Sequence, residues 1–237
     1  YSNLLERFYF VEMINYEGTH GKVGILKDRL TGKKIIFKIS QDVDYAIRHE
    51  HSIMSRMKGS RKYCPHFCEE FGSFLYPLDF LNQGNPFQPK DSRICSEVLL
   101  TEYIPGSTTV SSLINRLLPL KNVFSLIKQV MIAIEIGQRK FGLVHYDLHD
   151  DNILVTKCHP DTVFLYNFGN RQIVIPTYGL IPVIIDFGFS YIKGSVGQPL
   201  YSPMNYTDAG YLSCLFESFY DSRILLRNSS INFHKTL

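Results

Sequence analysis

The segment that decides how this sequence is interpreted is His145-Tyr-Asp-Leu-His-Asp-Asp-Asn152, which runs directly into the apolar residues Ile153-Leu-Val155. A second short apolar run, Ile181–Ile185, leads into Asp186-Phe-Gly188 in the same manner. Each run is too short for a typical helix and adjoins a cluster of polar residues. The two segments therefore indicate strands that border functional loops.

Three further segments precede these two along the chain. They are Gly18-Thr-His-Gly21-Lys-Val23, Ile35-Ile-Phe-Lys38 and, in the next predicted helix, Glu50. Taken singly, each is more simply explained as a turn, a solvated charge or an exposed helix residue. Their significance lies in their order and in the element predicted under each of them.

In this order the five segments resemble the motifs of eukaryotic-type protein kinases. The match runs through the glycine-rich loop, the V-A-I-K strand, the helix glutamate, the H-R-D-L-x-x-x-x-N loop and D-F-G. The resemblance covers almost the whole chain. It implies an α+β, two-lobed protein-kinase-like fold with an antiparallel sheet plus one helix in the N-lobe and a mainly helical C-lobe.

The resemblance also implies a role for each matching residue. Asp147 would act as catalytic base, Lys38 would bind the α- and β-phosphates of ATP, and Glu50 would hold Lys38 in place. Asn152 and Asp186 would bind Mg²⁺ through hard oxygen ligands. His145 would brace the loop, and His149 would stand near the transferred phosphate.

The nucleotide would lie in the cleft between the lobes, with Thr101 at the gatekeeper position. The residues that we expect to contact ATP are Gly18, Gly21, Val23, Ile36, Lys38, Thr101, Glu102 and Ile104. Glycines suit a phosphate loop because no side chain separates the backbone amides from the ligand.

Local patterns supply the elements. Strands are expected over 8–17, 22–28, 34–39, 67–75 and 97–103, and helices over 44–57 and up to 141, with Gly142 as cap. We place the N-lobe at 1–103 with an insertion at 76–96, and the C-lobe at 104–237 with an insertion at 157–182. The second insertion resembles that of haspin and of divergent serine/threonine kinases of large DNA viruses, which is the preferred family.

Four residues depart from the kinase pattern. Tyr16 replaces a glycine of the phosphate loop, Ile36 replaces a small alanine, Tyr146 replaces arginine and His149 replaces lysine. Without the arginine, activation by loop phosphorylation is not expected. His149 keeps open a small-molecule kinase of the aminoglycoside or choline type, and a pseudokinase or binding module of kinase fold is the other alternative.

The end of the chain is the largest departure. Only 51 residues follow Asp186, and Asp221 resembles the aspartate that opens the central helix of the large lobe. We expect the C-lobe to be truncated after that helix, with the apolar side chains of Ile224, Leu225, Leu226, Ile231 and Phe233 exposed. Self-association or a partner segment would then cover this face.

Composition excludes several classes of protein. The chain has 237 residues, 45% of them hydrophobic and 20% charged, as in an ordinary globular protein. A net charge of +3 is too weak to favour nucleic acid as a partner, and no apolar run is long enough to span a membrane. Five cysteines without C-x-x-C spacing indicate free thiols in a reducing compartment, so we expect a cytoplasmic protein, in the host cytoplasm if viral. The resemblance to protein kinases implies that the partner is a protein substrate.

Overall fold

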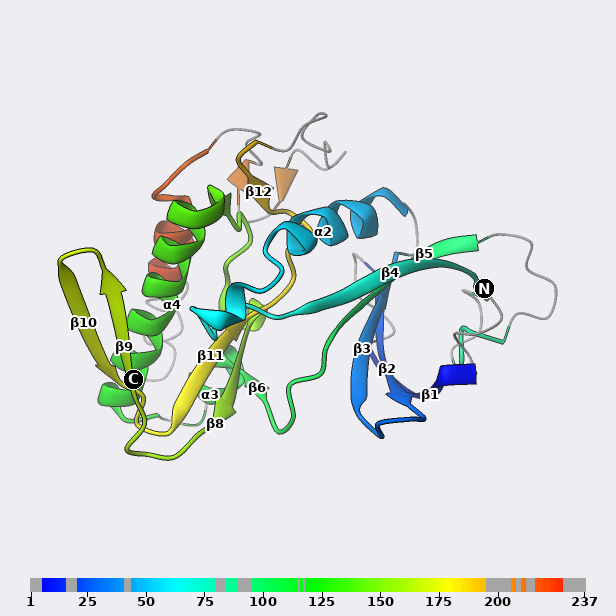
Figure 1. Ribbon diagram of the computed structural model, residues 1–237, viewed down its shortest axis with the longest axis horizontal. Coiled ribbons are helices and arrows are strands. Elements are labelled where there is room, and N and C mark those ends of the chain that lie inside the picture. The colour runs from blue at the N-terminus through cyan, green and yellow to red at the C-terminus, as the bar shows by residue number, and fades with distance from the viewer. Residues whose placement is uncertain are drawn as a thin grey trace. The chain divides into compact units, whose positions relative to one another are not determined.

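The computed structural model describes residues 6–15, 21–40, 44–79, 84–88, 95–114, 116, 118–194, 206–207, 210–211 and 216–227. The chain forms two compact units (Figure 1). The first contains residues up to Lys58 together with Glu69–Tyr103, and the second contains Gly59–Cys68 and the chain from Ile104 onward. In the described part of the chain, no helix combines the length and apolarity that crossing a bilayer requires.

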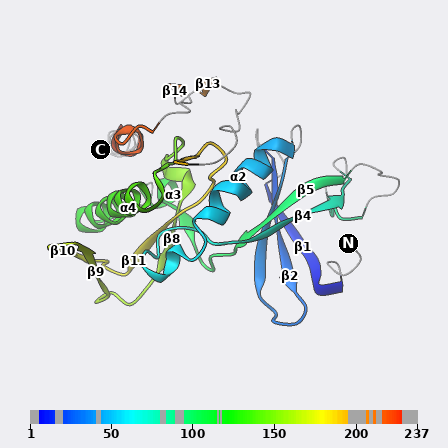
Figure 2. The ribbon, with the colours of Figure 1, turned by 45° about the horizontal axis from the view of Figure 1, so that its top comes forward.

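The first unit is built on a five-stranded antiparallel sheet of order β1-β2-β3-β5-β4. Its strands are β1 (Phe8–Asn15), β2 (Lys22–Asp28), β3 (Lys34–Ile39), β4 (Glu70–Pro77) and β5 (Cys95–Glu102). Helix α2 (Asp44–Arg56) packs against β3, β4 and β5 (Figure 2). The predictions for β2, β3 and α2 are confirmed, and the predicted 67–75 strand begins three residues later.

Alternation along β3 explains the two faces of this sheet. Ile35, Phe37 and Ile39 are buried in an apolar core, whereas Lys34, Ile36 and Lys38 point to the opposite face. The insertion between β4 and β5 contributes to that core, because Phe87 packs edge-on against Phe37 with ring centroids 4.9 Å apart. Pairing of β4 with β5 continues to Pro77 and Cys95, so the unpaired insertion is shorter than predicted.

The second unit is organised around α4 (Leu120–Phe141), whose apolar stripe is buried as predicted. Its other elements are η1 (Ser60–Lys62), β6 (Thr108–Thr109), α3 (Val110–Ile114), β7 (Leu143–Val144), η2 (Asp150–Asn152), β8 (Ile153–Lys157), β9 (Val163–Phe168), β10 (Arg171–Pro176), β11 (Leu180–Ile184), β12 (Tyr191–Ile192), β13 (Tyr206–Thr207), β14 (Gly210–Tyr211) and a helix at 220–227. Strands β11, β8 and β6 form one small sheet, and β12 pairs with β7. These pairings hold both ends of the 145–152 loop.

The insertion at 157–182 contains regular structure that the sequence did not reveal. Strands β9 and β10 form a hairpin that lies beside α4 (Figure 1). Two polar side chains of α4 donate hydrogen bonds to backbone carbonyls of the insertion. Ser125 Oγ donates to the Pro176 carbonyl at 2.6 Å, and Asn122 Nδ2 donates to the Tyr178 carbonyl at 3.2 Å. The insertion is therefore an integral part of the second unit.

A buried histidine joins this hairpin to the segment before β4. His66 Nδ1 donates to the Pro182 carbonyl at 2.8 Å, and His66 Nε2 accepts from the Tyr166 hydroxyl at 2.5 Å. Both ring nitrogens are thus satisfied by the neutral form, and burial lowers the pKa of His66 to about 4. Nearby, burial raises the pKa of the Cys64 thiol to about 11, and the four described cysteines are free thiols as predicted, with Cys214 outside the described residues.

The first prediction concerns the pH dependence of stability. The pKa of His66 is about 4 in the folded chain and 6.5 ordinarily, so the unfolded chain binds the proton more readily. The free energy of unfolding should then fall by ~2 kcal/mol between pH 7 and pH 5 on this account. Urea titrations at both pH values should show a smaller fall in His66→Gln, whose amide can keep both hydrogen bonds. An unchanged fall in that variant, or an equal effect of His159→Gln at an exposed position, would contradict the assignment.

The second prediction concerns the end of α4. Gly142 has a φ of 61°, and a Cβ there would lie 2.3 Å from Lys193 Cβ. Gly169, in the hairpin turn, has a φ of 58° and open space around that position. Gly169→Ala should therefore cost ~1 kcal/mol for backbone conformation alone, and Gly142→Ala should cost clearly more by chemical denaturation. Equal costs would show that the contact with Lys193 is unimportant.

Candidate active site

In the first unit, β3 and α2 bring together the predicted lysine and glutamate. Lys38 Nζ lies 2.8 Å from Glu50 Oε2, and the two side chains are 14% and 4% exposed. Because a charge this deeply buried is costly without a partner, each side chain stabilises the charged form of the other. The pair places one ammonium group at a fixed point on the face of the sheet that α2 covers.

The glycine-rich segment meets the same face at the start of β2. Gly21 has a φ of 145°, and a Cβ there would lie 2.4 Å from the carbonyl oxygen of Ile39. Only glycine permits this approach of two backbones. Val23 lies directly opposite Lys38 in the β2–β3 register, while Gly18 and Tyr16 lie outside the described residues.

The residues expected to surround adenine belong to β3, β5 and the chain that follows. Ile36 and Thr101 are directly opposite each other in the β3–β5 register, and both are half-buried. Glu102 ends β5, and Ile104 has a buried side chain in the second unit. Their contact with a nucleotide stays a prediction.

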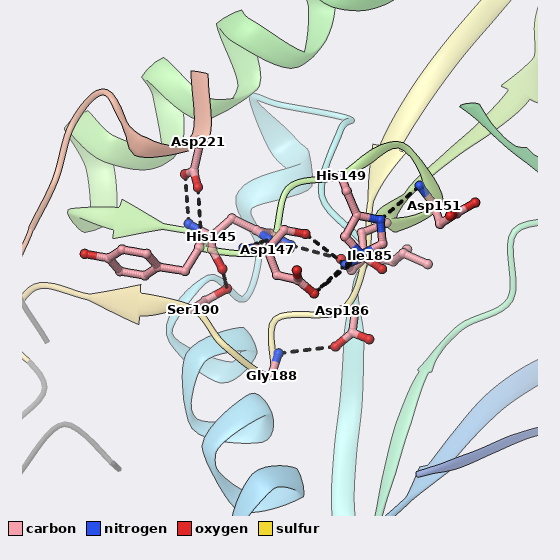
Figure 3. Close-up of polar contacts among 11 residues, drawn as sticks. His145, Asp147, His149, Asp151, Ile185, Asp186, Gly188, Ser190 and Asp221 are labelled. Atoms are coloured by element: carbon pink, nitrogen blue, oxygen red, sulfur yellow. Dashed lines mark hydrogen bonds and ion pairs between the residues drawn. The ribbon is translucent and has the colours of Figure 1, made fainter. Parts of the chain in front are cut away.

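In the second unit, the 145–152 loop brings three predicted residues together (Figure 3). Asn152 Nδ2 donates to the backbone carbonyl of Asp147 at 2.9 Å and to its Oδ2 at 3.0 Å. His149 Nε2 lies 3.6 Å from the same Oδ2 and 3.1 Å from Asn152 Nδ2. The amide of Asn152 therefore fixes the orientation of the Asp147 carboxylate.

The environment of His149 in this loop perturbs its pKa. The hydrogen bond with Asp147 raises the pKa of His149, and partial burial opposes that effect only in part. The backbone N–H of Asp151 donates to His149 Nδ1 at 3.3 Å. The imidazole is thus oriented with Nε2 toward Asp147.

Asp186 lies beside this loop. The backbone N–H of Ile185 donates to the Asn152 carbonyl at 3.0 Å, and Asp186 itself has a φ of 61°, which is rare for a residue other than glycine. Its Oδ1 accepts a hydrogen bond from Gly188 N at 3.4 Å (Figure 3). Such backbone strain is common at functional sites.

The donor atoms present suit a magnesium ion. With Nδ2 of Asn152 directed at Asp147, its side-chain oxygen accepts no hydrogen bond from any described residue and can serve as a ligand. Together with the Asp186 carboxylate it would offer the oxygen ligands that Mg²⁺ prefers. Within the described ranges, His149, Asp150 and Asp151 also place ligand atoms within 4.8 Å of one another.

His145 braces the loop, as expected. Its Nε2 donates to the Ile185 carbonyl at 3.0 Å, and its Nδ1 accepts from the backbone N–H of Asp147 at 3.3 Å. Ser190 Oγ donates to the His145 carbonyl at 3.2 Å. The histidine therefore connects the 145–152 loop to the segment that follows β11 and carries Asp186.

Asp221 holds the start of the loop from the helix at 220–227. Its fully buried carboxylate accepts hydrogen bonds from the backbone N–H groups of His145, at 2.8 Å, and Tyr146, at 2.9 Å (Figure 3). Desolvation raises the pKa of Asp221, and the two N–H groups oppose that rise. The position of Asp221 at the start of a helix confirms the prediction from sequence.

The expected exposure of this helix is wrong in part. Ile224 and Leu225 are buried, because the helix packs these two side chains inside the second unit, whereas Leu226 is exposed. Ile231 and Phe233 lie outside the described residues. A partner segment or self-association at this face stays a prediction.

The fold of this chain resembles that of a solved protein. A crystal structure of a kinase domain aligns with a TM-score of 0.54 and 16% sequence identity, covering 81% of this chain and 54% of that one. At such low identity the likeness establishes the fold, which is that of a kinase domain with a mixed α+β architecture and few helices. No family model matches the sequence.

Several curated relatives are viral proteins. Uncharacterized protein 098R of Invertebrate iridescent virus 6 is 28% identical over 83% of this chain. Putative phosphotransferase 057R of Frog virus 3 (isolate Goorha) is 26% identical over 78% of the chain, and Probable kinase 098L of Invertebrate iridescent virus 3 is 34% identical over 42% of it. The chain spans 39%, 34% and 19% of the lengths of these three proteins, respectively.

The third prediction tests the role of Asp221. Asp221→Ala leaves two buried N–H donors without an acceptor, which should lower the free energy of unfolding by ~2–6 kcal/mol. Urea denaturation measures this, with Asp161→Ala as a control at a carboxylate whose side chain is 90% exposed. A loss in Asp221→Ala no larger than in the control would show that the carboxylate does not hold the loop.

Proposed function

We propose that this chain is a protein kinase that transfers the γ-phosphoryl group of ATP to serine or threonine hydroxyls of a protein. The observation that carries the proposal is the Asp147 carboxylate, oriented by the Asn152 amide at 3.0 Å inside the H-x-D-L-x-x-x-x-N loop. The Lys38–Glu50 pair supports it, as do the names of the relatives that are called a probable kinase and a putative phosphotransferase.

In this proposal Asp147 accepts the proton of the acceptor hydroxyl as its oxygen attacks the γ-phosphorus. The bond from that phosphorus to the bridging oxygen breaks, and ADP leaves. Lys38, held by Glu50, binds phosphate oxygens of ATP, and backbone amides near Gly18 and Gly21 approach them. Mg²⁺ bound by Asn152 and Asp186 would neutralise phosphate charge.

The acceptor class follows from the residues after Asp147. The loop lacks the arginine-rich pattern of tyrosine kinases and has His149 and Asp150 there instead, which favours serine or threonine. Asp150 and Asp151 add negative charge, which favours basic residues near the acceptor. His149 beside Asp147 also favours, as a second candidate, phosphorylation of a small hydroxylated molecule.

Radiolabelled ATP separates these candidates. Incubation with a mixed protein extract should give phosphoserine or phosphothreonine, and labelling of an aminoglycoside or choline instead would favour the second candidate. Phosphotyrosine would contradict the proposed acceptor class. Labelling of neither acceptor class, with ATP bound, would favour a pseudokinase.

The fourth prediction separates the two aspartates. Asp147→Asn should lower kcat by ~10²–10⁴-fold and leave the Kd for ATP with Mg²⁺ within about twofold, because this carboxylate handles only the acceptor proton. Asp186→Asn should weaken binding of ATP only when Mg²⁺ is present. Nucleotide titrations with and without Mg²⁺ test this, with Asp161→Asn as control. Equal loss of binding in both variants would overturn the assignment of roles.

A further inference from the structure

Glu70, the first residue of β4, carries a buried carboxylate next to α2. Its side chain is 3% exposed, and its Oε1 lies 3.1 Å from His51 Nδ1. Its Oε2 has no hydrogen-bond partner among the described residues. A carboxylate this deeply buried depends on the partner it has, because water cannot replace a lost contact.

Polar contacts between described side chains join α2 to the sheet of the first unit. Arg48 Nε lies 2.8 Å from Glu97 Oε2 on β5, and this arginine side chain is 57% exposed. Glu50 contacts Lys38 on β3, and His51 contacts Glu70 on β4. Ser55 Oγ, one helical turn beyond His51, lies 3.3 Å from the same Nδ1 and helps to orient the ring.

The Glu50–Lys38 and His51–Glu70 contacts come from adjacent positions of α2. Successive residues of an α-helix differ by about 100° around its axis, so Glu50 and His51 point in different directions, toward β3 and β4. One contact alone would act as a pivot, whereas two in different directions oppose rotation about the axis. A rotation that removes Glu50 from Lys38 also removes His51 from Glu70 and leaves a buried carboxylate with both oxygens unpaired.

We infer that His51 and Glu70 are positioning residues that lock the orientation of α2 and thereby hold Glu50 on Lys38. The inference rests on the proposed function only insofar as Lys38 serves phosphoryl transfer. Neither residue contacts the Lys38 ammonium group in this arrangement, and their effect on it passes through the backbone of α2. Arg48, at an exposed position, contributes little to this lock.

The test measures the environment of Lys38 directly. The intact chain and the variants His51→Gln, Glu70→Gln and Arg48→Gln are pulsed with acetic anhydride without nucleotide, and acetylation is read by mass spectrometry. Lys38 should react at least ~5-fold faster in His51→Gln and Glu70→Gln than in the parent chain, as expected when a buried ion pair opens. The exposed Lys34 serves as internal reference, and Arg48→Gln should match the parent.

Kinetics give a second readout. In His51→Gln and Glu70→Gln, kcat should fall ~10–100-fold, because a misplaced ammonium no longer stabilises the transition state, while KM for ATP changes less. The exchanged pair His51→Glu with Glu70→His should restore protection of Lys38. If Glu70→Gln does not fold, His51→Gln, at a half-exposed position, still decides the question.

The outcomes separate the inference from the proposed function. Parent-like reactivity of Lys38 and parent-like kcat in a folded His51→Gln would overturn the inference while leaving the kinase proposal intact. A parent chain that transfers no phosphate, but whose Lys38 becomes reactive in both variants, would support the lock and contradict the proposed function.

Discussion

The second unit depends on one buried carboxylate. Asp221 accepts the backbone N–H groups of His145 and Tyr146, so the helix at 220–227 and the catalytic loop cannot separate without leaving three polar groups unpaired in the interior. Each such group would lose hydrogen bonding that water cannot restore. The position of Asp147 depends on this constraint, because His145 and Tyr146 immediately precede it, and Asn152 in turn donates hydrogen bonds to Asp147.

In the first unit too, buried charged side chains contact partners on other elements. Lys38, Glu50 and Glu70 are all largely withdrawn from water, and each has a partner on a different element. Buried ion pairs contribute little net stability, since desolvation offsets much of the attraction. These pairs instead favour one specific geometry, because any other arrangement of the same elements would leave a buried charge without a partner and destabilise the fold. The orientation of α2 on the sheet is therefore held by these two contacts.

The sequence was sufficient for elements with a strong local signal. Runs rich in β-branched and aromatic residues, bounded by turn residues, placed β2 and β3 correctly, the helical spacing of apolar residues placed α4, and Gly142 marked its end. Motif order correctly located Asp221 at a helix start. The β9–β10 hairpin was missed because its outward face carries Val163, Leu165 and Val174, so that polar alternation is absent. His51 and Glu70 were missed because their pairing depends on how α2 packs on β4, which no local pattern encodes.

Tyr146, one of the departures from the kinase pattern, also helps to hold the 145–152 loop against the helix at 220–227. The kinase pattern has an arginine at this position, whereas the Tyr146 ring is buried and lies 4.8 Å from the ring of Tyr220. Burial also raises the pKa of the Tyr220 hydroxyl. The contact joins the same two segments that Asp221 joins, the loop and the helix at 220–227. The aromatic contact therefore adds a second attachment between the loop and this helix, beside the hydrogen bonds of Asp221.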